Sequence, residues 1–159
     1  MKPDRRRAKR RGAELLEVTL IVGTLFGITF MLLDVSMVLF LRVTFQNAVR
    51  DGVRYAITGQ NSPGPCQDDS IKAVVNRSAL GFLGSESAAA TVHVHFINPA
   101  TGAVSNNAYG NIVEVSVEGY GAGPLAPFQR SKTPLQLWAR AYDMMEFVPG
   151  TLPCISHPE

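Results

Sequence analysis

The chain has 159 residues, of which 46% are apolar and 18% charged, and its formal net charge is +2. This length suits one domain with a tail or an anchor, and the composition argues against disorder and against a nucleic-acid-binding surface. The charge is unevenly divided. Residues 1–12 carry seven basic side chains and one acidic side chain, a net charge of +6, whereas residues 13–159 carry eight basic and twelve acidic side chains, a net charge of −4.

An apolar run follows this basic leader. Residues 18–41, 24 in number, contain a single formal charge, that of Asp34. As a helix they would span roughly 36 Å, enough for the ~30 Å hydrocarbon core of a bilayer and too long for a secretory signal. Residues 42–46 form no signal-peptidase site. Since basic residues remain on the cytoplasmic side, we expect the leader inside and the rest of the chain exported, which argues against a soluble cytoplasmic enzyme.

The junction between the leader and the apolar run has two notable residues. Gly12 closes the basic leader, and Glu17 is the fifth residue after it, just ahead of the apolar run. One interpretation is a solvated acid at the cytoplasmic interface, where a helix N-terminus favours negative charge. The other is a carboxylate that has a partner, because burying an unpaired carboxylate is costly.

Helical spacing continues beyond the apolar run, so we expect one helix over residues 13–59. Arg50 and Arg54 lie four residues apart on one face, and Asp51 stands three before Arg54, which predicts a weak ion pair. Gly52 costs a helix about 1 kcal/mol relative to Ala, which suggests the close approach of another backbone. Three surroundings stay open for this stretch: solvent, the protein's own sheet, or a partner helix. Its apolar positions are Ala48, Val49, Val53, Ala56 and Ile57.

The combination of basic leader, Gly12, Glu17 and long apolar helix resembles the class III signal of type IV pilins and pseudopilins. The following stretch, NAVRDGVRYA at residues 47–56, narrows the resemblance. Together with the late acid Asp34, it is similar to the TadE-like family, minor pilin-like components of the Tad (tight adherence, Flp) pilus system. The resemblance covers residues 12–58. Two departures are Asp34, where Glu is commoner, and Met37, where a basic residue is often seen.

This resemblance implies a pilin-like structural subunit, involved in pilus assembly and surface adherence, with no catalytic activity and no cofactor. A prepilin peptidase would cut after Gly12, so that Ala13 becomes the mature N-terminus and Glu17 faces the free amine of a neighbouring subunit. The implied location is the bacterial inner membrane, with a cytoplasmic N-terminus and a periplasmic C-terminal domain. The implied partners are the peptidase, other pilin-like subunits including the major pilin, the inner-membrane assembly platform and the lipid bilayer. The expected assembly contacts are Glu17, Asp34, Arg50, Asp51, Gly52 and Arg54.

Two alternatives remain open. One is a membrane-anchored periplasmic enzyme or binding domain that keeps its leader, although no phosphate-binding loop or nucleophile motif occurs in the sequence. The other is a pseudopilin of a secretion system, which would share the processing step. The mature N-terminus separates the anchored enzyme from both pilin interpretations.

The exported domain, residues 60–159, predicts an α+β fold of the pilin-like kind. A Pro- and Gly-rich segment at 61–65 ends the long helix, and an amphipathic helix of about 12 residues starts at Asp68. Its apolar side holds Ile71, Val74, Val75, Ala79 and Leu80, with Gly81 and Gly84 closing it. Period-two alternation then predicts three antiparallel strands with one covered face, over residues 91–98, 111–120 and 135–147, with a turn at 98–102 and a loop at 119–134.

Two residue pairs in this domain could carry chemistry. His93 and His95 could chelate zinc, but a site needs further ligands, and His157 is the one other histidine. We therefore predict no metal site and assign both histidines to a polar outer sheet face. Cys66 and Cys154 are the two cysteines, and in an exported domain we expect them to form a disulfide. A bond between subunits and two free thiols are the alternatives.

Overall fold

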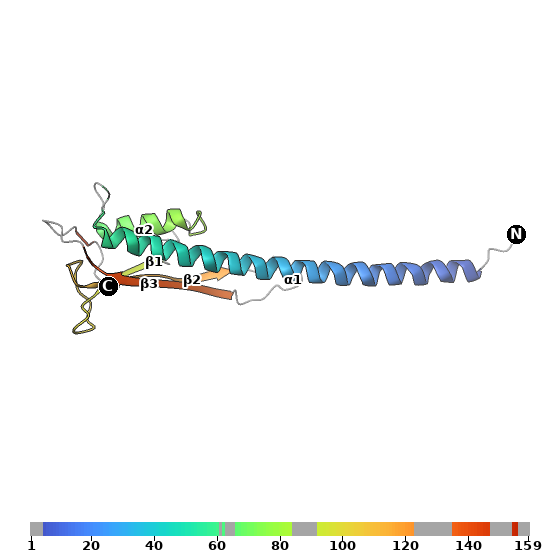
Figure 1. The fold of residues 1–159 in the computed structure, drawn as a ribbon. Coiled ribbons are helices and arrows are strands. Elements are labelled where there is room, and N and C mark those ends of the chain that lie inside the picture. The colour runs from blue at the N-terminus through green and yellow to red at the C-terminus, as the bar shows by residue number, and fades with distance from the viewer. Residues whose placement is uncertain are drawn as a thin grey trace.

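The computed structural model describes residues 5–60, 62, 66–83, 92–122, 135–146 and 154–155. Figure 1 shows one long helix whose C-terminal part carries a short helix and a sheet, while its N-terminal part extends alone. This arrangement confirms the predicted pilin-like α+β fold, with a long N-terminal helix, a second short helix and three antiparallel strands. The elements in chain order are α1 (Arg5–Ile57), α2 (Gln67–Ser78), β1 (Val92–Ile97), β2 (Ile112–Ala122) and β3 (Leu135–Met144).

Helix α1 begins earlier than the sequence pattern predicts. It starts at Arg5, inside the basic leader, and ends at Ile57. Arg, Lys and Ala are good helix formers, so the leader continues the helix through Gly12 although glycine costs about 1 kcal/mol there. Leader and apolar run are therefore one continuous helix.

The sheet is an antiparallel meander in the order β1-β2-β3. The predicted alternation is confirmed, because Val113, Val115 and Val117 of β2 are fully buried. One boundary was predicted wrongly: β2 does not stop at residue 120 but continues through Ala122, past a bulge between Val117 and Tyr120. Gly119 has a φ of 73° within that bulge, a backbone conformation that glycine adopts without a steric penalty. Residues 119–122 are thus strand and not loop, and 123–134 lie outside the described residues.

Helices α1 and α2 lie on the same side of the sheet (Figure 1). In α2, Ile71 and Val75 face the core as predicted, but Leu80 does not. The helix ends at Ser78, and Leu80 adopts a φ of 56° and is exposed. Gly84 lies outside the described residues. The core between the two layers is formed by Leu41, Phe45, Ala48, Val49, Val53, Ala56, Ile71, Val75, Ala79, Leu83, Val92, Val94, Phe96, Val113, Val115, Val117, Leu137, Ala139 and Met145.

Candidate functional site

Helix α1 has two segments with different surroundings. In the membrane segment, residues 14–40, nearly every side chain is exposed, and in the head segment, residues 41–57, one face is buried against α2 and the sheet. Over Glu14–Ile57 the helix is long and apolar enough to cross a bilayer, with a mean hydropathy of 2.1 in its most apolar window. The large exposed apolar side chains of the membrane segment are Leu15, Leu16, Val18, Leu20, Ile21, Val22, Leu25, Phe26, Ile28, Met31, Leu32, Leu33, Val35, Leu39 and Phe40.

The hydroxyl groups of the membrane segment bond to the helix itself. Thr19, Thr24 and Thr29 donate to the carbonyl oxygens of Leu15, Leu20 and Leu25 at 2.7–2.9 Å. Ser36 donates in the same way to Leu32 at 2.7 Å. In lipid, each polar group needs a partner within the protein, and these side chains find one on their own helix. These hydroxyl groups are therefore compatible with a hydrocarbon environment.

The two predicted acids lie at different depths along this segment. Glu17 is exposed near its start, and Asp34 is half-buried near its end. They are 17 residues apart, which places them roughly 26 Å apart along the helix axis. Between them lie Gly23 and Gly27, one turn apart, where an added Cβ would meet nothing within 4 Å. Small residues at this spacing permit close helix contacts in membranes, and the spacing is visible in the sequence.

The head segment divides the NAVRDGVRYA stretch into two faces. Ala48, Val49, Gly52, Val53 and Ala56 are buried, and Asn47, Arg50, Asp51 and Arg54 are exposed. The buried face packs on α2 and the three-stranded sheet, which together with residues 41–57 are called the head below. For this face, the surroundings are therefore the protein's own sheet and second helix. The four predicted contact residues 50, 51, 52 and 54 therefore do not form one surface, because Gly52 points inward.

Gly52 marks the tightest packing of α1 in the head. A Cβ at this position would lie 2.5 Å from Cγ2 of Val75 in α2, and 3.5 and 3.6 Å from side-chain carbons of Ile71 and Val115. The predicted close approach is therefore present, but it involves side chains of α2 and β2 and not a partner backbone. No side chain larger than a hydrogen atom fits here unless the Val75 side chain or α2 shifts.

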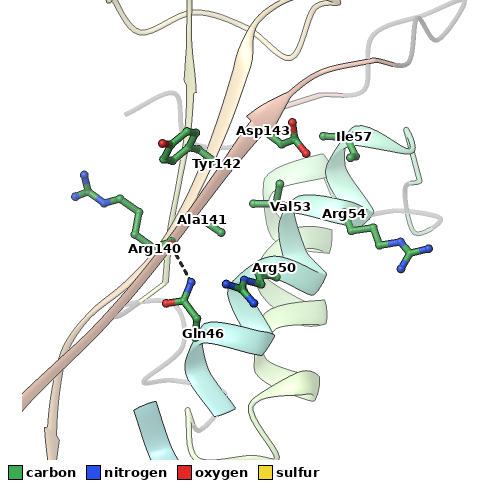
Figure 2. A pocket seen from close by; sticks show the side chains of 9 residues that line it. All are labelled: Gln46, Arg50, Val53, Arg54, Ile57, Arg140, Ala141, Tyr142 and Asp143. Carbon is green, nitrogen blue, oxygen red and sulfur yellow. Dashed lines mark hydrogen bonds between the residues drawn. The ribbon is translucent and has the colours of Figure 1, made fainter. Parts of the chain in front are cut away.

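A groove of about 500 Å³ runs between α1 and β3 (Figure 2). Ala141 and Asp143 point toward α1, and Arg140 and Tyr142 point away from it. The Gln46 amide donates to the carbonyl oxygen of Arg140 at 3.1 Å, which satisfies one open backbone acceptor of this edge strand.

Arg50 and Arg54 both border this groove from α1. Within the described residues neither arginine makes an ion pair, so the predicted pair between Asp51 and Arg54 is not formed. The exposed half of the stretch therefore presents two guanidinium groups that make no ion pair within the described head.

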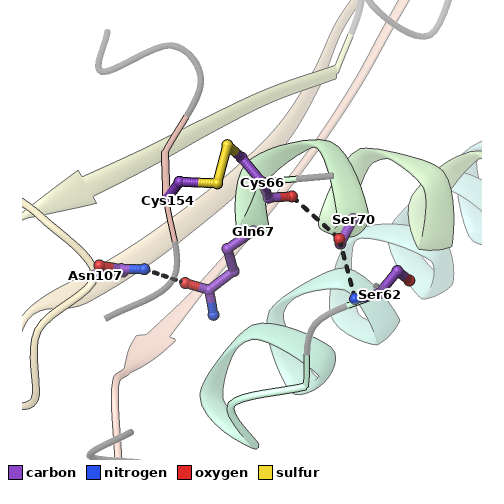
Figure 3. The surroundings of a disulfide bond; sticks show 6 residues. All are labelled: Ser62, Cys66, Gln67, Ser70, Asn107 and Cys154. Carbon is purple, nitrogen blue, oxygen red and sulfur yellow. Dashed lines mark hydrogen bonds between the residues drawn. A yellow bond between two sulfur atoms is a disulfide. The ribbon is translucent and has the colours of Figure 1, made fainter. Parts of the chain in front are cut away.

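A disulfide joins Cys66 to Cys154, with 4.8 Å between their Cα atoms (Figure 3). The backbone N–H of Gln67 donates to the Cys154 carbonyl at 2.9 Å, and the Ser70 hydroxyl donates to the Cys66 carbonyl at 3.1 Å. The start of α2 is thereby tied to the C-terminal end of the chain. Both alternatives to the intramolecular bond are absent from this structure.

Beside the disulfide lies a buried amide pair that the sequence pattern did not reveal. The Gln67 side chain is buried and donates to the carbonyl of Ala56 at the end of α1, at 3.5 Å. Its Oε1 accepts a 2.5 Å hydrogen bond from Nδ2 of Asn107, which lies between β1 and β2 (Figure 3). Three parts of the head thus meet at one glutamine, and such a buried polar group would be costly without its partners.

The outer face of the sheet carries charged and aromatic side chains. Arg140 lies 3.3 Å from Glu114 and 3.3 Å from Glu118 on the neighbouring strand. Trp138 and Tyr142 stand on either side of it along β3, with 68% and 71% of their surface exposed. The sequence predicted that this face is polar, but the pairing needed the register of β2 against β3.

The histidine pair lies on the same outer face. The rings of His93 and His95 stack with centroids 6.2 Å apart. Among the residues that the structure describes, no three His, Cys, Asp or Glu side chains come together as a metal site. His157 is outside the described residues.

A long apolar N-terminal helix packed by its C-terminal part on a small antiparallel sheet defines a pilin-like protein. Residues 12–54 match the model of a family described as TadE-like protein, which confirms the resemblance seen in the sequence. The matched segment contains the whole membrane segment and most of the two-faced stretch. No curated protein and no solved structure matches the chain.

Proposed function

We propose that this protein is a structural, pilin-like subunit of the Tad/Flp pilus system, with a part in pilus assembly and surface adherence. The observation that carries the proposal is the coincidence of two features in residues 12–54. The segment matches the TadE-like family, and the apolar surface of its residues 14–40 is left uncovered by the head. An uncovered apolar helix of this length is stable only in a bilayer or against other helices.

The proposed orientation follows from charge. The +6 leader stays in the cytoplasm, α1 crosses the inner membrane, and the head lies in the periplasm. The disulfide in the head supports this side, because disulfides persist in the oxidising periplasm. Other pilin-like subunits, the major pilin and the assembly platform are the proposed partners.

The proposed processing step removes residues 1–12. Because α1 runs without a break from Arg5 to Ile57, cleavage after Gly12 shortens the helix but leaves the membrane segment and the head intact. Ala13 then carries a free amine. The exposed Glu17 lies four residues further on, and in lipid its carboxylate needs a cation, which the amine of a neighbouring subunit would supply.

Intact-mass measurement of the membrane protein, with prepilin peptidase present and absent, tests this function. The mature chain should begin at Ala13 when the peptidase is present, and a Gly12→Leu variant should remain full length. Gly27→Leu is the matched control, since it makes the same change in the same helix and should be processed normally. Glu17→Ala should be cut but should support fewer pili. A chain that keeps Met1 beside an active peptidase would contradict the proposal.

A further inference from the structure

Two exposed faces of the head carry opposite excesses of charge. The outer helix face, formed by Asn47, Arg50, Asp51 and Arg54, has two arginines and one acid. The outer sheet face, defined as the β2–β3 part of the sheet's outer surface, is formed by Glu114, Glu118, Trp138, Arg140 and Tyr142 and has two acids and one arginine. His93 and His95 lie beside it on β1. The sheet separates the two faces, because α1 covers its inner side (Figure 1). One copy therefore cannot bring its own two faces together.

The outer sheet face has the composition of a binding surface. Trp138, Arg140 and Tyr142 are alternate residues of β3, so their side chains project from one face at intervals of roughly 6.6 Å. Trp, Tyr and Arg are the residue types most enriched at the energetic centres of interfaces. Arg140 is held between Glu114 and Glu118, which leaves the faces of the two flanking rings open to a further cation.

The outer helix face offers such cations. Arg50 and Arg54 make no ion pair within the described part of the chain, and they are one helical turn apart, roughly 6 Å. This spacing is close to the interval between alternate residues of β3. Guanidinium groups pack well on aromatic rings and bind carboxylates in the same plane, and the outer sheet face provides both.

Charge also disfavours the two symmetric arrangements. Two outer helix faces in contact would bring four arginines against two acids, and two outer sheet faces would bring four glutamates against two arginines. Like charges across an interface cost several kcal/mol. Contact between an outer helix face and an outer sheet face brings together three acids and three arginines, so the charges of the interface cancel.

The membrane adds a geometric condition. If every copy crosses the bilayer in the same direction, all α1 helices are parallel. A contact from the sheet of one copy to the helix of the next satisfies this condition, because each copy follows the last without reversal. Such a heterologous contact leaves one unused face at each end, so that it can be repeated into a ring or a filament.

We infer that the outer sheet face of one copy of this chain binds the outer helix face of the next copy. Trp138 and Tyr142 stack on Arg50 and Arg54, and Glu118 pairs with the same arginines. This inference rests on the proposed function, because it assigns the head contacts of an assembling pilin-like subunit.

Photo-cross-linking in membranes tests the contact. The full-length chain is expressed with p-benzoylphenylalanine in place of Trp138, together with a tagged copy of different mass. Irradiation should yield a cross-linked pair, and peptide mapping should place the new bond within residues 47–54 of the other copy. The same probe in place of Thr101, which is exposed on the loop after β1, is the control and should give no such bond.

Charge variants sharpen the test. The double variant Arg50→Glu/Arg54→Glu should lower the cross-linking yield about five-fold or more, because it removes both cations and adds like charge. Arg77→Glu reverses a single charge on α2, outside both faces, and should leave the yield within about two-fold. Adding Glu118→Arg to the double variant should recover part of the yield, which a folding defect would not allow.

Three results would overturn the inference: a bond from position 138 to the sheet of the other copy, capture of a different protein alone, or a yield no higher than at position 101. An equal loss in Arg77→Glu would show a net-charge effect and would overturn it as well. The outcome is separable from that of the proposed function. If the chain is cleaved after Gly12 but does not cross-link, only the inferred contact is contradicted. If the chain cross-links but is not cleaved, only the proposed processing is contradicted.

Discussion

The membrane segment and the head segment of α1 are parts of one helix, yet their sequences suit different surroundings. Residues 14–40 carry large apolar side chains on every side, with hydroxyl groups that bond to their own backbone. Residues 41–57 carry small side chains on one face, Ala48, Gly52 and Ala56, and charges on the other. A helix in lipid needs apolar side chains on all sides. A helix that packs on a sheet and a second helix needs small side chains where these elements approach it.

Removal of the disulfide should give the largest difference in stability between the head and the membrane segment. Cys66→Ala/Cys154→Ala should destabilise the head by about 2–4 kcal/mol, because the unfolded chain regains the freedom of the 88-residue separation. The membrane segment should stay helical, since none of its contacts involve the bond. Trp138, the single tryptophan, reports unfolding of the head by fluorescence, and circular dichroism reports the helix. Coincident loss of both signals, or an unchanged midpoint, would contradict this expectation.

Glycine-to-alanine substitutions should have opposite signs in the two segments. Gly52→Ala places a Cβ 2.5 Å from Val75 Cγ2, and overpacking of this kind costs about 1–3 kcal/mol. Gly27→Ala meets nothing within 4 Å and should gain up to about 1 kcal/mol from helix propensity. In micelles, denaturant unfolding followed by Trp138 fluorescence measures the first effect, and the loss of helical circular dichroism measures the second. A neutral Gly52→Ala would mean that α2 moves aside freely.

The sequence predicted the parts of this fold that follow a simple period. Val92, Val94 and Phe96 alternate with His93 and His95, and the structure buries the first three as expected. Periodicity is reliable there because a strand in this sheet has one covered face and one open face. Ala48, Val49 and Val53 of α1 face the core for the same reason, with the period of a helix in place of the two-residue period of a strand.

Other features depend on contacts between distant residues and could not be predicted from spacing. The continuation of β2 past Gly119 looks like the start of a loop, because a glycine in a bulge and a glycine in a turn are alike in sequence. The role of Gln67 needs the end of α1 and the loop before β2 to meet. The early start of α1 at Arg5 follows from the helix propensity of Arg, Lys and Ala, which the charge of the leader does not reveal.

Asp34 tests how far the membrane segment tolerates charge. It lies seven residues before Leu41, about 10 Å from the outer end of the apolar run. Asp34→Leu should insert at least as well as the parent, with a gain below the roughly 2.5–3.5 kcal/mol of a central charge. It should nevertheless support fewer pili if the carboxylate contacts another subunit. Val35→Leu is the control at the same depth. Normal piliation with Asp34→Leu would contradict a contact of this carboxylate with another subunit.

The smallest expected effect comes from a pair of threonines, one in each segment. Thr24 donates to the Leu20 carbonyl at 2.9 Å in the membrane segment, and Thr44 donates to the Phe40 carbonyl at 2.8 Å in the head segment. Each of these carbonyls also serves the helix ladder, so removal of the hydroxyl leaves no acceptor unpaired. Thr24 is exposed, so Thr24→Val should change stability by less than about 0.5 kcal/mol, as surface changes usually do. Thr44 is buried, and Thr44→Val should change stability by about 1 kcal/mol or less, the net contribution of one hydrogen bond.

The number of pili tests the role of Thr24 more sharply than stability does. Thr24 lies between Gly23 and Gly27, on a stretch where another helix could approach closely. If α1 helices pack there, Thr24→Val keeps the shape of the side chain and should leave pilus number unchanged, whereas Thr24→Leu adds bulk and should lower it. Counting pili by electron microscopy at equal membrane levels of the protein measures this. Fewer pili with Thr24→Val would show that its hydroxyl bonds to a neighbouring helix and not only to Leu20, and equal numbers with Thr24→Leu would show that no helix packs on this side of α1.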